Sequence, residues 1–175
     1  MEKDKNMYDL PSDNVKIARR EYKDFLVDGY YAKKYDKGKV QYTLVPDIFF
    51  NIRLDTIGYD NVPTYDDHEI TLLNMNKEGL ISFIRYAGLC LGGVVNLYTE
   101  LAKIYTYGLE KGYGRESWKT VPNAIDRYNN AMERHFRTFK SGKYINEEDG
   151  GMLHIAQAAW NALTLLWFME NNNEG

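Results

Sequence analysis

The last third of the chain, residues 107–170, constrains the fold more than any other part of the sequence. The segment from Ala158 to Met169 is almost continuously apolar, and apolar residues before it recur at the three- and four-residue spacing of an α-helix. Polar side chains interrupt this pattern at helical spacing. A polar group buried without a partner costs about 1–3 kcal/mol, so these positions need an explanation. Either the helices line a binding cleft, or their polar side chains satisfy one another inside the structure.

Three polar sets occupy helical faces in the predicted helices 94–110, 123–140 and 150–170. The sets are Asn96, Glu100, Lys103 and Tyr107; Arg127, Asn130 and Arg134, with His135 beside them; and His154, Gln157 and Asn161. If the three helices are neighbours, their arginines and lysines would neutralise phosphates, and their amides would bind the edge of a base. Carboxylates such as Glu100 and Asp149 would then hold a Mg²⁺ ion that bridges phosphate oxygens.

Composition limits the class of protein. A chain of 175 residues with 44% hydrophobic and 27% charged residues is expected to form one soluble domain over residues 1–175. A net charge of −3 argues against a nucleic-acid polymer as partner. The single cysteine, Cys90, excludes an internal disulfide and a cysteine-based zinc cluster. The charged start has no signal-peptide pattern, and the longest apolar run is too short to cross a bilayer, so we expect a cytoplasmic protein without a membrane partner.

Capping and helix-breaking residues predict where the elements lie. The expected fold class is mainly α, a helical bundle with at most a small β element. Residues 70–75 remain open between a short strand and an irregular packed segment. The expected elements are a helix over 12–30, a short extended segment over 40–45, and helices over 47–57, 77–91 (capped by Asn76), 94–110 (after a break at Gly92 and Gly93), 123–140 (after Pro122) and 150–170 (capped by Asp149).

Familiar catalytic signatures are not found in the sequence. There is no Ser/His/Asp or Cys/His arrangement, and the three histidines do not have zinc-ligand spacing. The stretch from Gly112 to Arg115 is too short for a phosphate-binding glycine-rich loop.

Four pieces of sequence form a combined pattern. They are Asp36 to Pro46; Glu100, with Tyr107, Gly108, Lys111, Tyr113, Gly114 and Trp118; Tyr128, Ala131, Arg134 and His135; and Glu147, Asp149, Gly151, His154 and Asn161. In this combination the chain resembles the phage dATP/dGTP diphosphohydrolase family. The similarity covers residues 36–49 and 94–170 and leaves an unmatched insert at about 50–93.

The resemblance implies an all-α nucleotide pyrophosphohydrolase related to the MazG-type enzymes. Such a protein cleaves a purine deoxynucleoside triphosphate to the monophosphate and pyrophosphate with Mg²⁺ or Mn²⁺, and it is expected to form a homo-oligomer in a phage-infected or prophage-bearing bacterium. By resemblance, Glu100 and Asp149 lie near the metal and His154 completes the catalytic set. The implied substrate-binding residues are Lys111, Tyr113, Trp118, Asn130, Arg134, His135 and Asn161.

The sequence departs from the family pattern at several positions. Asn130 stands where the family has an aspartate, so the expected metal site has one carboxylate fewer and should bind Mg²⁺ more weakly. Asp149 shortens the second acid of the family's acidic pair, and Gly112 is inserted before Tyr113. The Asn130 substitution and the unmatched insert at about 50–93 suggest an alternative function. In it, the chain is an inactive phage protein that sequesters a nucleotide signal of host immunity.

Overall fold

The computed structural model describes residues 38–52, 63–66 and 71–172. The helix expected over 12–30 lies outside these residues. The chain divides into two compact units, residues 1–39 and 40–175, and the description below concerns the second. The single domain expected over residues 1–175 therefore stays a prediction.

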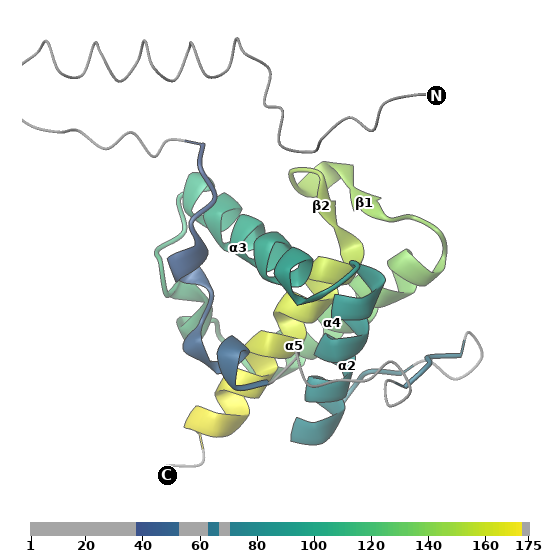
Figure 1. Ribbon diagram of the computed structural model, residues 1–175. Coiled ribbons are helices and arrows are strands. Elements are labelled where there is room, and N and C mark those ends of the chain that lie inside the picture. Colours follow the sequence, from purple (N-terminus) through teal and green to yellow (C-terminus); the bar gives the residue numbers. More distant parts are fainter. Residues whose placement is uncertain (1–37, 53–62, 67–70, 173–175) are drawn as a thin grey trace, which may run out of the picture. The chain divides into compact units, whose positions relative to one another are not determined.

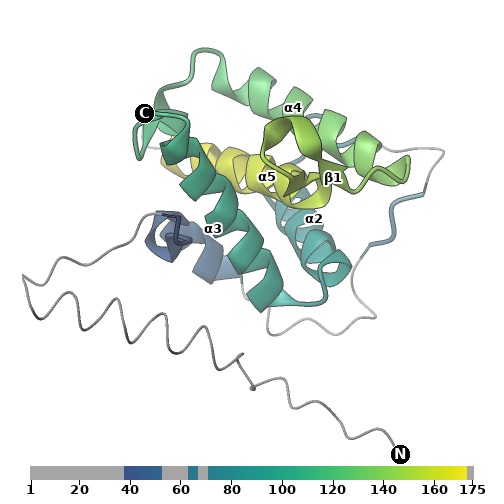
Figure 2. The same ribbon diagram turned by 90° about the horizontal axis from the view of Figure 1, so that it is seen from above.

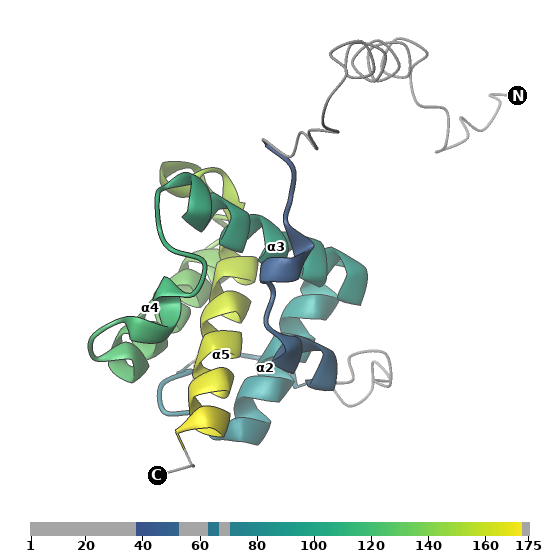
Figure 3. The same cartoon turned by 90° about the vertical axis from the view of Figure 1, so that its left-hand side faces the viewer.

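Four α-helices make up most of the described part of the chain (Figure 1). They are α2 (Lys77–Cys90), α3 (Val94–Glu110), α4 (Ala124–Lys140) and α5 (His154–Asn171). Helix α5 is central and packs against each of the other three. Figures 2 and 3 show α4 on one side of α5 and α3 on the other. The expected class, mainly helical with a small β element, is confirmed.

The central position of α5 follows from its sequence. A helix that is apolar on most of its faces is stable only when other elements surround those faces. Most residues of α5 are buried, including its alanines 156, 158, 159 and 162. These small side chains leave room for neighbouring helices, and the bulkier Leu163, Leu165 and Leu166 fill the core between them.

Several predicted helix boundaries are confirmed. The side chain of Asn76 caps α2 by accepting a hydrogen bond from the Gly79 N–H at 2.8 Å. Gly92 and Gly93 separate α2 from α3, and the chain bends there by 102°. Helix α3 ends as predicted at Glu110, where Gly112 has a φ of +88° that few other residues adopt.

Two predictions about the β element and the last helix are wrong. Residues 40–45 are not extended, because Tyr42–Leu44 forms a 3₁₀ turn that buries Leu44. The described strands are instead β1 (Ile145–Asn146) and β2 (Met152–Leu153), which pair antiparallel. Asp149 does not cap α5, which begins later, at His154. Gly150 and Gly151 have φ values of +70° and +72°, so the chain turns there instead of continuing as a helix.

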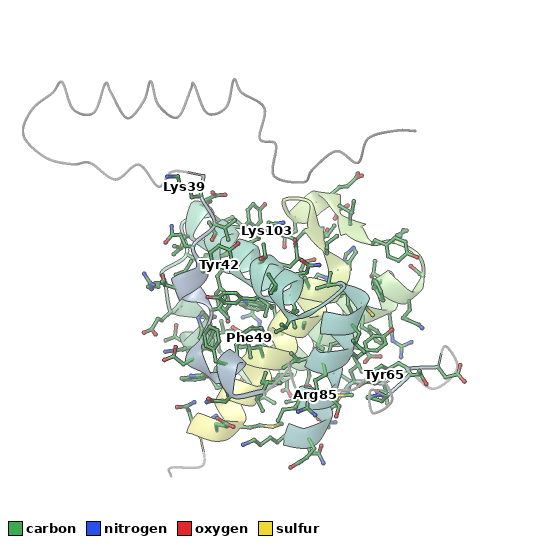
Figure 4. All side chains as sticks on the ribbon, in the orientation of Figure 1. Lys39, Tyr42, Phe49, Tyr65, Arg85 and Lys103 are labelled. Carbon is green, nitrogen blue, oxygen red and sulfur yellow. The ribbon has the colours of Figure 1, made fainter. Side chains whose placement is uncertain are left out.

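The connecting segments pack closely against the helices. The segment from Asp47 to Ile52 is a 3₁₀ helix that carries Phe49, which Figure 4 labels. The Phe49 ring stacks on that of Tyr98 in α3, with ring centroids 5.5 Å apart. Residues 71–75 are irregular and packed, which resolves the question left open by the sequence for those positions. The buried Leu72 N–H donates to Glu133 Oε2 of α4 at 2.6 Å.

No single helix of the described residues has both the length and the apolar character needed to cross a membrane. Helices α2 and α3 meet such a criterion only when they are taken together across their bend.

Candidate functional site

An open groove of about 710 Å³ lies between α4 and the segment that carries β1. Helix α4 contributes Arg134, His135 and Thr138 to one wall. The other wall is residues 143–148, and His154, the first residue of α5, also lines the groove. The groove therefore brings together residues of two separate sequence motifs. One motif contains Arg134 and His135, and the other contains Glu147 and His154.

Two histidines form a direct pair in this groove. Nδ1 of His135 lies 3.0 Å from Nδ1 of His154. Burial lowers the pKa of His135 to about 4, and the nearby Arg134 guanidinium and His154 act in the same direction, while Asp149 opposes them. Burial also lowers the pKa of His154, with Lys143 as a second cause. Both rings are therefore neutral at pH 7.

Arg134 and Lys143 both line the groove and bring positive charge to it. Within the described residues neither takes part in an ion pair. An unpaired guanidinium suits two oxygens of one phosphate, and an ammonium suits a further phosphate oxygen. Glu147 and Glu148 also line the groove, so its charge is mixed.

A hydrogen-bonded network lies beside the groove and holds its second wall. Lys111 Nζ pairs with Asp149 Oδ1 at 2.7 Å, and Gln157 Nε2 donates to Asp149 Oδ2 at 2.8 Å. Asn146 Nδ2 donates to Gln157 Oε1 at 3.0 Å, and Asn161 Nδ2 donates to the Gln157 carbonyl oxygen at 2.7 Å. The Asp149 partner raises the pKa of Lys111. These residues thus satisfy one another, which is the structural explanation for the polar face of α5.

Glycine at position 150 lets this wall approach α3. A Cβ atom there would lie 2.8 Å from Cε2 and Cζ of Tyr107. The Lys111 ammonium lies 4.9 Å from the centre of the same Tyr107 ring and 5.8 Å from that of Tyr113. The Lys111, Tyr113 and Asp149 positions named from the sequence are therefore close together.

Three other predicted residues lie apart from the groove. Glu100 pairs with Lys103 on α3 at 2.5 Å. The exposed Asn130 donates to the Asp126 carbonyl oxygen of its own helix at 2.8 Å. Trp118 is buried against Trp167, with ring centroids 5.1 Å apart, and lines a separate hollow. The roles predicted for these three side chains remain predictions.

The sequence did not single out Lys143 and Tyr144. Tyr144 lines the groove and is 60% exposed, and its ring meets Phe139 edge to face at 5.5 Å. Both residues follow the glycine that ends α4 and have no periodic pattern around them. The sequence feature that could have indicated them is their position between the basic end of the helix predicted over 123–140 and the acidic residues 147–149.

The described residues contain no group of three or more His, Cys, Asp or Glu side chains that could hold a metal ion. Both oxygens of Asp149 already accept hydrogen bonds, and Glu100 has a lysine partner. A metal site built from protein ligands alone therefore does not fit this part of the chain. Glu147 and Glu148 are the carboxylates that line the groove.

The helices and the groove define a small α-helical protein with a site suited to a phosphorylated ligand. The chain belongs to the family described as dATP/dGTP diphosphohydrolase, N-terminal, whose model matches residues 84–175, more than half of the chain. The match includes α3, α4, α5 and all residues that line the groove. The matched range begins at residue 84, inside the segment 50–93 for which the sequence motifs gave no counterpart in the family. No curated protein and no solved structure matches the chain.

Proposed function

We propose that the groove binds the phosphates of a purine deoxynucleoside triphosphate, and that the protein hydrolyses this nucleotide to the monophosphate and pyrophosphate. The observation that carries the proposal is that Arg134 and Lys143 line the same groove as the His135–His154 pair. The family match supports the substrate class, because the family is described by the hydrolysis of dATP and dGTP.

Arg134 and Lys143 would bind the phosphate oxygens and stabilise the negative charge that develops as a phosphoanhydride bond breaks. The Lys111–Asp149 pair lies beside the groove and holds the turn of Glu147–Asp149 in place. His154 and His135, neutral at pH 7, each have one ring nitrogen that can accept a proton and one that can donate a proton in the groove.

Tyr144 and Tyr113 offer exposed aromatic faces for the base. Tyr144 is 60% exposed and Tyr113 is 59% exposed. Stacking of a base on an aromatic ring contributes about 1–3 kcal/mol. Because Phe139 supports the Tyr144 ring and Tyr144 lines the groove, Tyr144 is the first choice.

Mg²⁺ or Mn²⁺ is proposed as an ion that enters with the nucleotide, since Mg²⁺ in nucleotide sites is commonly held by substrate phosphates and one or two carboxylates. When bound, it would neutralise phosphate charge. Glu147 and Glu148, which line the groove, are the carboxylates that would hold it.

A second candidate function is binding without hydrolysis. The observation that favours it is the absence, within the described residues, of three side chains able to hold a metal. In that case the groove would sequester a signalling nucleotide of host immunity during phage infection. The cytoplasmic location and the homo-oligomer belong to both proposals, and light scattering on a chain of 20.4 kDa would measure the number of subunits.

The test is incubation of the purified protein with each of the four deoxynucleoside triphosphates, with Mg²⁺, Mn²⁺ or EDTA, followed by chromatography. A monophosphate together with pyrophosphate would establish the enzyme and identify its base. Nucleotide that is bound and recovered intact would favour the second candidate. Deoxynucleoside triphosphates that neither bind nor react would contradict the hydrolysis, and a screen of cyclic and signalling nucleotides would then test the second candidate, which a lack of binding in that screen would contradict.

Arg134→Ala is the informative variant, and Arg127→Ala is its matched control. Both arginines are exposed on α4, two helical turns apart, but Arg127 does not line the groove. Loss of a charge-assisted phosphate contact of about 1.5–3 kcal/mol should weaken nucleotide binding by about 10–150-fold in the first variant alone. Equal binding by both variants would remove the groove as the phosphate site.

A further inference from the structure

We propose that His135 and His154 act as one proton relay, in which a single shared proton connects the attacking water to the leaving pyrophosphate. This inference rests on the hydrolysis proposed above and adds the residues that move its protons.

The geometry requires the two neutral rings to be different tautomers. The contact joins Nδ1 of one ring to Nδ1 of the other at 3.0 Å, so one Nδ1 carries a proton and the other accepts it. A neutral ring with Nδ1–H has a lone pair on Nε2, and a neutral ring with a bare Nδ1 carries Nε2–H. The pair therefore presents one acceptor and one donor on its two Nε2 atoms.

The surroundings keep the pair neutral. Arg134 and His135 belong to α4, and Lys143 and Tyr144 follow it. Glu147 and Glu148 line the groove from the acidic turn, and Asp149 lies beside it, close enough to act on His135. Burial, Arg134 and Lys143 disfavour a second proton on the pair, and Asp149 acts in the opposite direction. The pKa of each ring is therefore lowered, so both rings are neutral at pH 7. A single proton then lies in the hydrogen bond between the two Nδ1 atoms.

The position of the pair distinguishes a relay from a structural contact. A structural pair needs only burial and a hydrogen bond. These two rings also line the groove that holds Arg134 and Lys143. Among the described residues no hydrogen bond is recorded for either Nε2. The remaining ring nitrogens are thus left for a ligand or water.

The proposed step balances. The oxygen of water forms a bond to the α-phosphorus, and its proton passes to the Nε2 that has the lone pair. The Nδ1 proton of that ring moves to Nδ1 of the partner ring, and the partner's Nε2 proton goes to the oxygen that bridges the α- and β-phosphorus. The bond between the α-phosphorus and that oxygen breaks, and its electron pair leaves with pyrophosphate. Each ring is neutral before and after, with the tautomers exchanged.

The first test measures the tautomers by nitrogen NMR of the full-length protein labelled with ¹⁵N-histidine. The resonances are assigned with His135→Gln and His154→Gln, and His68 is the third histidine of the chain. At pH 7 we expect one of the paired rings to carry Nδ1–H and the other Nε2–H, or an average of the two states in fast exchange. Two rings that both carry only Nε2–H would overturn the relay.

The second test is kinetic. Each glutamine variant should lower kcat by about 10²–10⁴-fold, while the Kd of a non-hydrolysable nucleotide analogue changes only a few-fold. Since the two rings act as one unit, the double variant should be no slower than the slower single variant. His68→Gln should keep the wild-type kcat.

The outcomes separate the two proposals. Wild-type protein that hydrolyses no nucleotide would overturn the proposed function and the relay with it. Hydrolysis that survives unchanged in either glutamine variant, or losses that multiply in the double variant, would overturn the relay alone.

Discussion

At the scale of single residues, the polar groups of this chain fall into two kinds. Gln157 and Asn161 are buried and hydrogen-bonded to neighbours, so they stabilise the wall beside the groove. Arg134 and Lys143 lie in the groove without an ion pair among the described residues. Helical spacing marked most of these positions as polar on the sequence. It could not separate the two kinds, because partners from distant segments decide which groups are satisfied.

The histidine pair predicts a pH dependence of stability. The pKa of His135 falls from 6.5 to about 4 on folding, so the unfolded chain takes up a proton first as the pH is lowered. The contribution of His135 to the free energy of unfolding is therefore present above pH 6.5 and is lost between pH 6.5 and about 4. Urea denaturation at pH 7 and pH 4.5 should show a smaller decrease for His135→Gln than for the wild type. Equal decreases would contradict the lowered pKa, since both proteins have the same carboxylates.

Glu133 gives a second prediction at this scale. Its carboxylate accepts from the Leu72 N–H at 2.6 Å and from Arg137 Nε at 2.6 Å. Glu133→Ala leaves a buried N–H without a partner and should lower the free energy of unfolding by about 1–3 kcal/mol. Glu133→Gln keeps an acceptor oxygen and should cost less, as measured by urea denaturation. A glutamine variant as unstable as the alanine variant would show that charge matters more than the hydrogen bond.

At the scale of elements, the turn between β1 and β2 depends on two adjacent glycines. Gly150 and Gly151 have almost the same positive φ, but only a Cβ at Gly150 would meet the ring of Tyr107. Gly151→Ala should cost about 1–2 kcal/mol from the backbone alone. Gly150→Ala should lower the free energy of unfolding by more, because its Cβ would meet the Tyr107 ring. Adding Tyr107→Ala to the Gly150→Ala variant should recover part of this additional loss. Equal losses for the two glycine variants, measured by urea denaturation, would show that the Tyr107 ring moves aside freely.

Most helix boundaries could be predicted from the sequence because local residues determine them. Asn76 caps α2 with its own side chain, and Gly112 ends α3 by its backbone conformation. The errors have a different cause. Residues 40–45 are apolar enough for a strand, but they bury Leu44 and Val45 in a 3₁₀ turn against the helices. Asp149 precedes the last helix as a cap would, but its carboxylate binds Lys111, 38 residues earlier.

At the scale of the whole unit formed by residues 40–175, one helix connects the core to the groove. Helix α5 begins with His154 in the groove and continues through the centre of the bundle. Leu163 is fully buried in its middle. Leu163→Ala should lower the free energy of unfolding by about 2–5 kcal/mol, because it removes buried methyl groups and leaves a cavity.

Val95→Ala is the control for this change. Val95 is 72% exposed, and its truncation should alter the free energy of unfolding by less than about 0.5 kcal/mol. Thermal or urea unfolding of the two variants measures both values. A small loss for Leu163→Ala would mean that the helices close readily around the cavity.

Because α5 is central, the two walls of the groove differ in how well they tolerate mutations. His154 cannot shift without disturbing a helix that the rest of the bundle surrounds, and its partner His135 lies next to the fully buried Phe136 of α4. The wall of residues 143–148 is mostly exposed and is held by two pairs of strand residues and the Asp149 contacts. Mutations can therefore accumulate on that wall at little cost to folding. A protein built in this way can acquire a new ligand preference by exchanging one short surface turn while its proton-carrying wall stays as it is.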